Sequence, residues 1–146
     1  QNLGAKQIER AEKSVYTTAR YNVIFMAWIM VITLAFGQYI ISFFTNDGQV
    51  KTVAIEALQI MSIGFIFYGI GMVLINTFNG AGDTWTPTGI NFFGFWLFQI
   101  PLAFVLAKHF NMGPTGVCIG IPVAETAITL AGIFFYKRGK WKRVQV

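Results

Sequence analysis

The sequence predicts an all-α membrane protein with four transmembrane helices, and three observations support this fold class. Long stretches lack charged residues, hydrophobic residues make up 55% of the chain, and charged residues only 12%. A helix over Tyr21 to Asn46 would be about 39 Å long, which exceeds the roughly 30 Å of bilayer hydrocarbon. The expected spans cover about residues 21–45, 57–80, 86–107 and 114–136.

The segment before the first span is polar and is expected to be helical. From Ala5 to Arg20 it carries Glu9 and Lys13, four residues apart in the favourable order for an ion pair. This helix would lie at the membrane surface or lead directly into the first span.

Turn residues separate the four spans. Asn46-Asp47-Gly48 is expected to close the first hairpin, because Asn and Asp bond their own backbone and Gly accepts a positive φ. Gly80-Ala81-Gly82-Asp83-Thr84 ends the second span, and Asn111-Met112-Gly113-Pro114 makes the last turn. Thr86 followed by Pro87 predicts a helix N-cap with proline at the first helical position.

The basic residues predict the orientation. Nine of the eleven Lys and Arg residues precede the first span or follow the fourth, where such residues act as topology signals. Both termini are therefore expected in the cytoplasm, with a basic cytoplasmic tail at 137–146. Because the positive charge flanks the spans, it is a poor indication of nucleic-acid binding, and no nucleic-acid partner is expected.

Small residues recur at helical spacing within the spans. Gly116, Gly120 and Ala124 repeat every four residues, and Gly64 and Gly71 lie two turns apart. Small residues let membrane helices approach closely, so these positions predict helix contacts and carry no function by themselves.

Two prolines within the spans are hinge candidates. Pro101 and Pro122 each remove a backbone donor and free the carbonyl four residues earlier. Either proline could form a static kink tolerated by its neighbours, or a hinge whose free carbonyl faces a polar cavity.

Glu125 is the one formally charged side chain inside a predicted span, near its midpoint. An isolated carboxylate there costs several kcal/mol unless it is protonated, paired or hydrated. Two interpretations remain open: a protonated acid bonded to a neighbouring helix, or a proton or cation site. Helical spacing puts Glu125 on a polar stripe opposite Val123, Leu130 and Phe134, and the stripe contains Cys118, Pro122, Thr129, Gly132 and Tyr136.

Further polar residues within the spans could bond between helices or line a substrate or ion path. These candidates, with Glu125, are Tyr68, Asn76, Asn91, Gln99 and Thr129. No pattern indicates an enzyme, because no metal-ligand spacing and no Ser/His/Asp set occurs. No cofactor is expected.

The order of several motifs resembles the multidrug and toxic compound extrusion family over essentially the whole chain. These motifs are Gln1-Asn2-Leu3-Gly4-Ala5-Lys6-Gln7, Glu9-Arg10-Ala11, Asn79-Gly80-Ala81-Gly82-Asp83-Thr84, Thr86-Pro87, Ile100-Pro101-Leu102-Ala103, Gly113-Pro114-Thr115-Gly116-Val117 and Lys137-Arg138-Gly139-Lys140-Trp141.

The resemblance implies a twelve-helix secondary antiporter with two six-helix bundles around a central cavity. Such transporters export drugs and organic cations in exchange for Na⁺ or H⁺. This chain would be the ninth to twelfth helices, in the C-terminal bundle, and the missing N-terminal eight helices would be its partners. Membrane lipid and a small organic substrate would be further partners, and the expected location is a bacterial inner membrane.

The sequence departs from the family at one point. Several members carry a coupling acid in the middle of the tenth helix, but the corresponding run from Ala57 to Gly82 has none. Glu56 lies only at its outer entrance, so the cation site of the family is not carried over to this chain. Glu125 could substitute for it, although the family pattern does not imply this.

Two alternatives to an exporter fragment remain open. The chain could belong to a lipid-linked sugar flippase of the same superfamily. It could also be a small structural or accessory membrane subunit that is complete with four helices.

Overall fold

A computed structural model describes residues 1–143, and within these residues the chain is helical and contains no strand. Two elements, η1 and η2, are π-helical, and η3 is a 3₁₀ turn. In order, the elements are α1 (Ile8–Phe44), α2 (Gly48–Ile63), α3 (Phe65–Gly80), α4 (Trp85–Asn91), η1 (Phe92–Gln99), α5 (Ile100–Phe104), η2 (Val105–His109), α6 (Gly113–Arg138) and η3 (Lys140–Arg143).

The predicted all-α membrane fold is confirmed. Among the described residues, α1, the continuous helix Trp85–His109 and α6 are each long and apolar enough to cross a membrane. The helices α2 and α3 are long and apolar enough only when they are taken together, and the pair is bent by 53°; as one span it is the second of four along the chain. The sequence had predicted an unbroken helix over 57–80.

The polar N-terminal segment leads directly into the first span. Neither glycine nor proline interrupts α1 before Gly37, so one helix of 37 residues forms. The expected ion pair between Glu9 and Lys13 does not form, and Glu12 pairs instead with Lys142.

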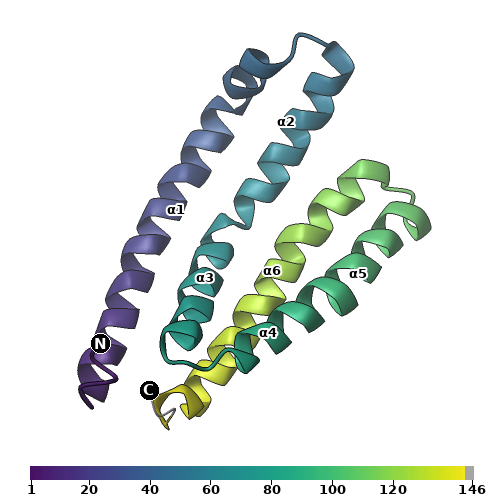
Figure 1. Cartoon of the computed structure of the whole chain (residues 1–146). Helices are drawn as coiled ribbons and strands as arrows, with labels where there is room; N and C mark the ends of the chain where they lie inside the picture. Colours follow the sequence, from purple (N-terminus) through teal and green to yellow (C-terminus); the bar gives the residue numbers. More distant parts are fainter. Residues whose placement is uncertain (144–146) are drawn as a thin grey trace.

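The four spans stand in a row whose third member is α6. The first span, α1, packs on α2 and α3; these pack on α6; and α6 packs on the third span, from α4 to η2 (Figure 1). Both termini and the turn between α3 and α4 lie at one end, called here the terminal end. The α1–α2 and η2–α6 turns lie at the opposite, hairpin end.

The predicted close contacts of the small residues in α6 are confirmed. Gly116 lies against the backbone of Leu106 and Ala107, and Gly120 against Ala103. Ala124 is completely buried. These contacts bring the backbones of α6 and the third span close together, and a larger side chain would not fit between them.

The predicted first turn forms, although Gly48 does not take the positive φ expected of it, and the predicted cap at Thr86 is wrong. Asp47 caps α2, because its Oδ1 accepts hydrogen bonds from the backbone N–H groups of Gln49 at 2.9 Å and Val50 at 3.1 Å. Thr86 is not an N-cap, since α4 begins at Trp85. The Asp83 carboxylate is a stronger hydrogen-bond acceptor than the Thr86 hydroxyl. It accepts hydrogen bonds from the Thr86 N–H at 3.1 Å and from the Thr86 hydroxyl at 2.6 Å.

Pro101 lies in α5, between the two π-helical segments. At their ends, Ile100 N–H bonds to the Phe95 carbonyl, and Phe110 N–H bonds to the Val105 carbonyl at 3.2 Å, both five residues back. Wider turns thus flank the proline, and Trp85–His109 still forms one span. A hinge role for Pro101 stays a prediction.

The C-terminal segment folds back onto the N-terminal one in what we call the terminal clasp: Glu12, Tyr16, Tyr136, Trp141 and Lys142. Trp141 is only 2% exposed, its ring stacks on Tyr136 at 5.1 Å between centroids, and its Nε1–H donates to the Tyr136 carbonyl at 3.2 Å. Tyr16 meets the Tyr136 ring edge-on, and Glu12 forms the ion pair with Lys142.

The expected basic tail therefore begins as ordered structure. Lys137 and Arg138 form the last turn of α6, and Gly139 turns the chain with a φ of 71°. The 3₁₀ turn η3 follows at once. The part of the expected tail from 144 to 146 lies outside the described residues.

We expect Trp141→Ala to lower the free energy of unfolding by about 3 kcal/mol, because it empties a buried site between α1 and α6. Trp85→Ala is the matched control, since Trp85 is 86% exposed, and it should change this energy by less than about 0.5 kcal/mol. Denaturant unfolding in mixed micelles measures both. Equal effects of the two substitutions would contradict the clasp.

Candidate functional site

The second span breaks at Gly64, and at this position α6 comes too close for a side chain. A Cβ on Gly64 would lie 2.7 Å from the Cβ of Pro122, closer than real Cβ atoms approach. Helix α2 ends one residue earlier, with the Gly64 N–H bonded to the Met61 carbonyl at 3.1 Å. The new helix α3 begins directly afterwards, with Tyr68 N–H bonded to the Gly64 carbonyl at 2.9 Å.

A cavity of about 180 Å³ lies beside this break. Its lining is almost entirely apolar, and Glu125 and Tyr68 are the lining residues whose side chains carry a polar group. The full lining is Met61, Gly64, Phe65, Tyr68, Ile121, Pro122 and Glu125. The cavity thus contains one of the predicted hinges and two of the predicted pathway residues.

Glu125 is half-buried in α6 and faces the break. The ion pair and the side-chain hydrogen bonds between different spans of the described chain involve other groups: Lys142 with Glu12, Thr115 with Glu56, and Thr129 with Phe67. Within the described residues, the carboxylate therefore has no protein cation to neutralise it.

Thr129, one turn further along α6, has a structural contact. It is completely buried, and its hydroxyl donates to the Phe67 carbonyl at 2.7 Å, in the first turn of α3. This bond ties α6 to the second span next to the break. On the opposite face of α6, Val123, Leu130 and Phe134 are exposed, as the sequence predicted.

The structure does not bring the other predicted residues to this cavity. Asn91, Gln99 and Pro101 belong to the third span, which packs on another part of α6. Gln99 is half-buried, and its Oε1 has no hydrogen-bond partner in the described chain. Asn76 is exposed and lines a separate, more polar pocket of about 380 Å³ between α1 and α3.

Sequence reasoning missed two polar residues near these sites. Asn22 in α1 lines the pocket with Asn76, and its Oδ1 is buried against Gly69 without a described partner. Ser62 is completely buried in the last turn of α2, where its hydroxyl donates to the Gln59 carbonyl at 2.9 Å. Two features of the sequence could have identified these residues: Asn22 is polar in an otherwise apolar run, and Ser62 lies two residues before a glycine.

The arrangement suits a proton or a monovalent cation. Half-helices that meet inside a membrane present free carbonyls at one end and free N–H groups at the other, and such ends contribute to ion sites in transporters. Here Glu125 and Tyr68 line a small cavity beside the break, together with Gly64. No group of three or more His, Cys, Asp or Glu side chains in residues 1–143 is placed to hold a metal ion.

We expect Gly64→Ala to destabilise the protein by about 1–3 kcal/mol, because the added methyl forces α6 away from the break. Gly80→Ala is the matched control within the same span, since a Cβ there meets nothing within 4 Å. It should be neutral or stabilising by up to about 1 kcal/mol. Unfolding in mixed micelles compares the two, and equal stabilities would show that the Gly64–Pro122 contact does not hold the break.

Comparison with known proteins agrees with the motifs and the fold. The model of the MatE family matches residues 1–105. The chain is 26% identical to the probable multidrug resistance protein YoeA of Bacillus subtilis over its whole length, which is 31% of that protein. Over 84% of the chain it is 26% identical to the probable multidrug resistance protein NorM of Thermotoga maritima, covering 26% of that protein.

A mammalian protein is also similar. Multidrug and toxin extrusion protein 1 of Mus musculus is 23% identical over 97% of the chain and 25% of its own length. The chain thus spans about a third or less of these relatives. No solved structure matches it. With a family model that covers residues 1–105 of 146, the chain belongs to the MatE family, the multidrug and toxic compound extrusion proteins that its motifs resemble.

Proposed function

We propose that this chain is the last third of an ion-coupled antiporter that exports drugs or organic cations. Its spans would be the ninth to twelfth helices, in the C-terminal bundle, with eight further helices supplying the other bundle. Family membership supports this role, as do the multidrug resistance proteins that the chain resembles over 84% to 100% of its length. A substrate cavity between bundles needs both bundles, and alternating access requires that they move against each other.

The observation that carries the coupling proposal is Glu125 facing the break in the second span. A carboxylate at this depth is stable when it binds a proton or when a cation neutralises it. The two ions exclude each other at one site, so exchange between them gives the protein two states. Because the described chain offers no basic partner to Glu125, the exchanging ion is the natural counter-charge.

The break offers a way to transmit ion binding to the helices. A cation held between Glu125 and the carbonyls at the end of α2 would draw α6 towards the second span. Protonation of Glu125 would remove that attraction. We assign the hinge of this movement to Pro122, because it contacts Gly64 at the break. The coupling ion, Na⁺ or H⁺, is a transported substrate in this scheme.

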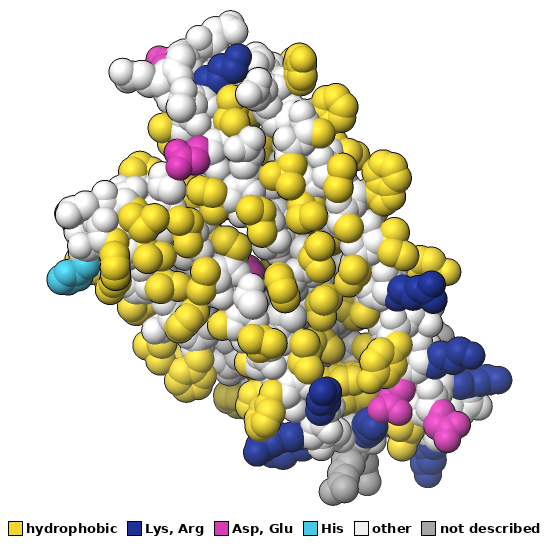
Figure 2. Space-filling view, turned by 180° about the vertical axis from the view of Figure 1, so that it is seen from behind, with side chains coloured by type: hydrophobic (Ala, Val, Ile, Leu, Met, Phe, Trp, Pro, Cys, Tyr) yellow, Lys and Arg dark blue, Asp and Glu magenta, His cyan; other side chains and the backbone are white. Residues whose placement is uncertain are grey.

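The same proposal places the terminal end in the cytoplasm of a bacterial cell. Lys and Arg side chains gather at that end (Figure 2), where the two ends of the chain meet. The hairpin end has Lys51 and Lys108. Such an asymmetry is what the positive-inside rule associates with a cytoplasmic face.

We expect Glu125→Gln to fold and bind substrate but to reduce gradient-driven export roughly tenfold or more, the scale of a typical coupling free energy. The amide keeps the shape of the side chain and can no longer exchange a proton or neutralise a cation. Glu56→Gln is the matched control, because Glu56 is an exposed carboxylate at the hairpin end that bonds only to Thr115 among the described residues. Proton- and sodium-driven efflux should be measured separately with the full-length protein in liposomes.

Near-normal efflux by a well-expressed Glu125→Gln protein under both gradients would eliminate the coupling role. Glu125 would then be an interhelical residue, and the break would be a packing feature. If Glu125→Gln and Glu56→Gln lost the same share of export activity, the conclusion would be the same, because the loss would not depend on the cavity.

The orientation has its own test. In a Cys118→Ser background, an impermeant thiol reagent added outside intact cells should label Gly48→Cys and not Lys140→Cys, because the terminal end would face the cytoplasm. Cell lysis should make Lys140→Cys reactive and serves as the control for its accessibility. The reverse labelling pattern would overturn the assigned orientation.

A further inference from the structure

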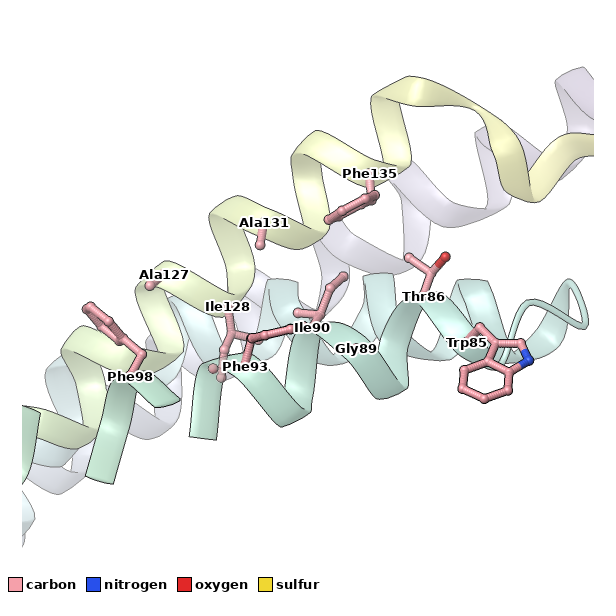
Figure 3. Close-up of a pocket in the computed structure, with 11 residues that line it drawn as sticks. Trp85, Thr86, Gly89, Ile90, Phe93, Phe98, Ala127, Ile128, Ala131 and Phe135 are labelled. Atoms are coloured by element: carbon pink, nitrogen blue, oxygen red, sulfur yellow. The ribbon is translucent and has the colours of Figure 1, made fainter. Parts of the chain in front are cut away.

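An apolar groove of about 500 Å³ lies between the third span and α6, and we call it the α6 groove. Figure 3 shows its two walls, one formed by α4 and η1 and the other by α6. Phe93 and Phe98 line the first wall, and Ala127, Ala131 and Phe135 line the second. The groove is distinct from the Glu125 cavity, with which it shares no lining residue.

The groove opens on an apolar face of the chain. Phe93 is 62% exposed and Phe98 42% exposed, although both are large and apolar. The alanines of α6 leave a trough between the aromatic rings of the two walls (Figure 3). Such a trough within the hydrocarbon layer is filled by something apolar, since water would leave its walls unfavourably hydrated.

Positive charge lies at one end of the groove. Ala127, Ala131, Phe135 and Arg138 follow one another at steps of four, four and three residues, so they lie on one face of α6. Arg138 is exposed just beyond Phe135, with its guanidinium 4.7 Å from the centre of the Phe134 ring. Lys137 is exposed beside it.

Trp85 marks the same end on the opposite wall. It begins α4 at the terminal end, lines the groove and is 86% exposed. Tryptophan prefers the boundary between hydrocarbon and head groups, where its ring is apolar and its N–H can bond. With Trp85 at this boundary, the groove would run from the hydrocarbon to the level of the lipid phosphates.

We propose that the α6 groove binds one acyl chain of an anionic phospholipid, with the phosphate held by Arg138 and Lys137. The apolar walls match the chain, and the basic residues at the mouth match a negatively charged head group. An organic cation is a poorer occupant, because the same two side chains would repel it. The inference does not depend on ion coupling or on which side of the membrane the terminal end faces.

The test compares phosphatidylglycerol with phosphatidylcholine of identical acyl chains. The full-length protein is titrated with each lipid in detergent, and bound lipid is counted by native mass spectrometry. We expect the anionic lipid to bind more tightly to the unchanged protein. Arg138→Gln should weaken phosphatidylglycerol about fivefold, the effect of one basic residue near a lipid surface, and leave phosphatidylcholine unchanged.

A second substitution tests the groove itself, and each change has a control. Ala131→Leu fills the trough and should weaken both lipids. Val123→Leu, on the exposed face of the same helix outside the groove, should weaken neither. Lys51→Gln removes one basic residue at the hairpin end and should leave phosphatidylglycerol binding as it was.

Equal binding of the two lipids to the unchanged protein would overturn the proposal, as would equal losses for Lys51→Gln and Arg138→Gln. Absence of bound lipid, or lipid binding that Ala131→Leu leaves intact, would also overturn it and would indicate that another helix of the full-length protein fills the groove. Arg138 is exposed, so its substitution tests the proposal even if Ala131→Leu fails to fold.

Discussion

The close approach of α6 to both of its neighbours is the constraint on which the rest of the structure depends. Membrane helices gain little from hydrophobic burial against one another, so they rely on contact between backbones and small side chains. Gly116 and Gly120 allow this contact with the third span, and Gly64 and Gly71 allow it with the second. The break, the cavity beside it and the row of four spans all follow from the position of α6.

Much of this fold could be predicted, because the spans and the small-residue contacts depend on composition and helical spacing. The break at Gly64 could not, since a glycine in an apolar run allows a straight helix as readily as a bent one. The residue packed against this glycine is Pro122, 58 positions away in the chain. The terminal clasp was missed for the same reason: Trp141 is buried in a cluster that Leu3, Ala11 and Val15, near the other end of the sequence, pack against.

The candidate site divides in the same way. Glu125 could be singled out from sequence, because a lone acid in an apolar span is costly wherever the helix packs. Its neighbours could not, since spacing tells which residues share a face and not which helix covers that face. Tyr68 and Glu125 meet in one cavity, whereas Asn76 and Gln99, equally polar in sequence, lie with other helices.

The terminal clasp also determines how this group of helices can deform. It joins the start of α1 to the end of α6, so the first and fourth spans are held together at the terminal end. The two hairpins diverge towards the opposite end (Figure 1). With the clasp as fulcrum and α1 about 55 Å long, a tilt of about 5° displaces the far tip by about 5 Å. Small rearrangements near the fulcrum are thus amplified at the far end, where the loops of the two hairpins separate.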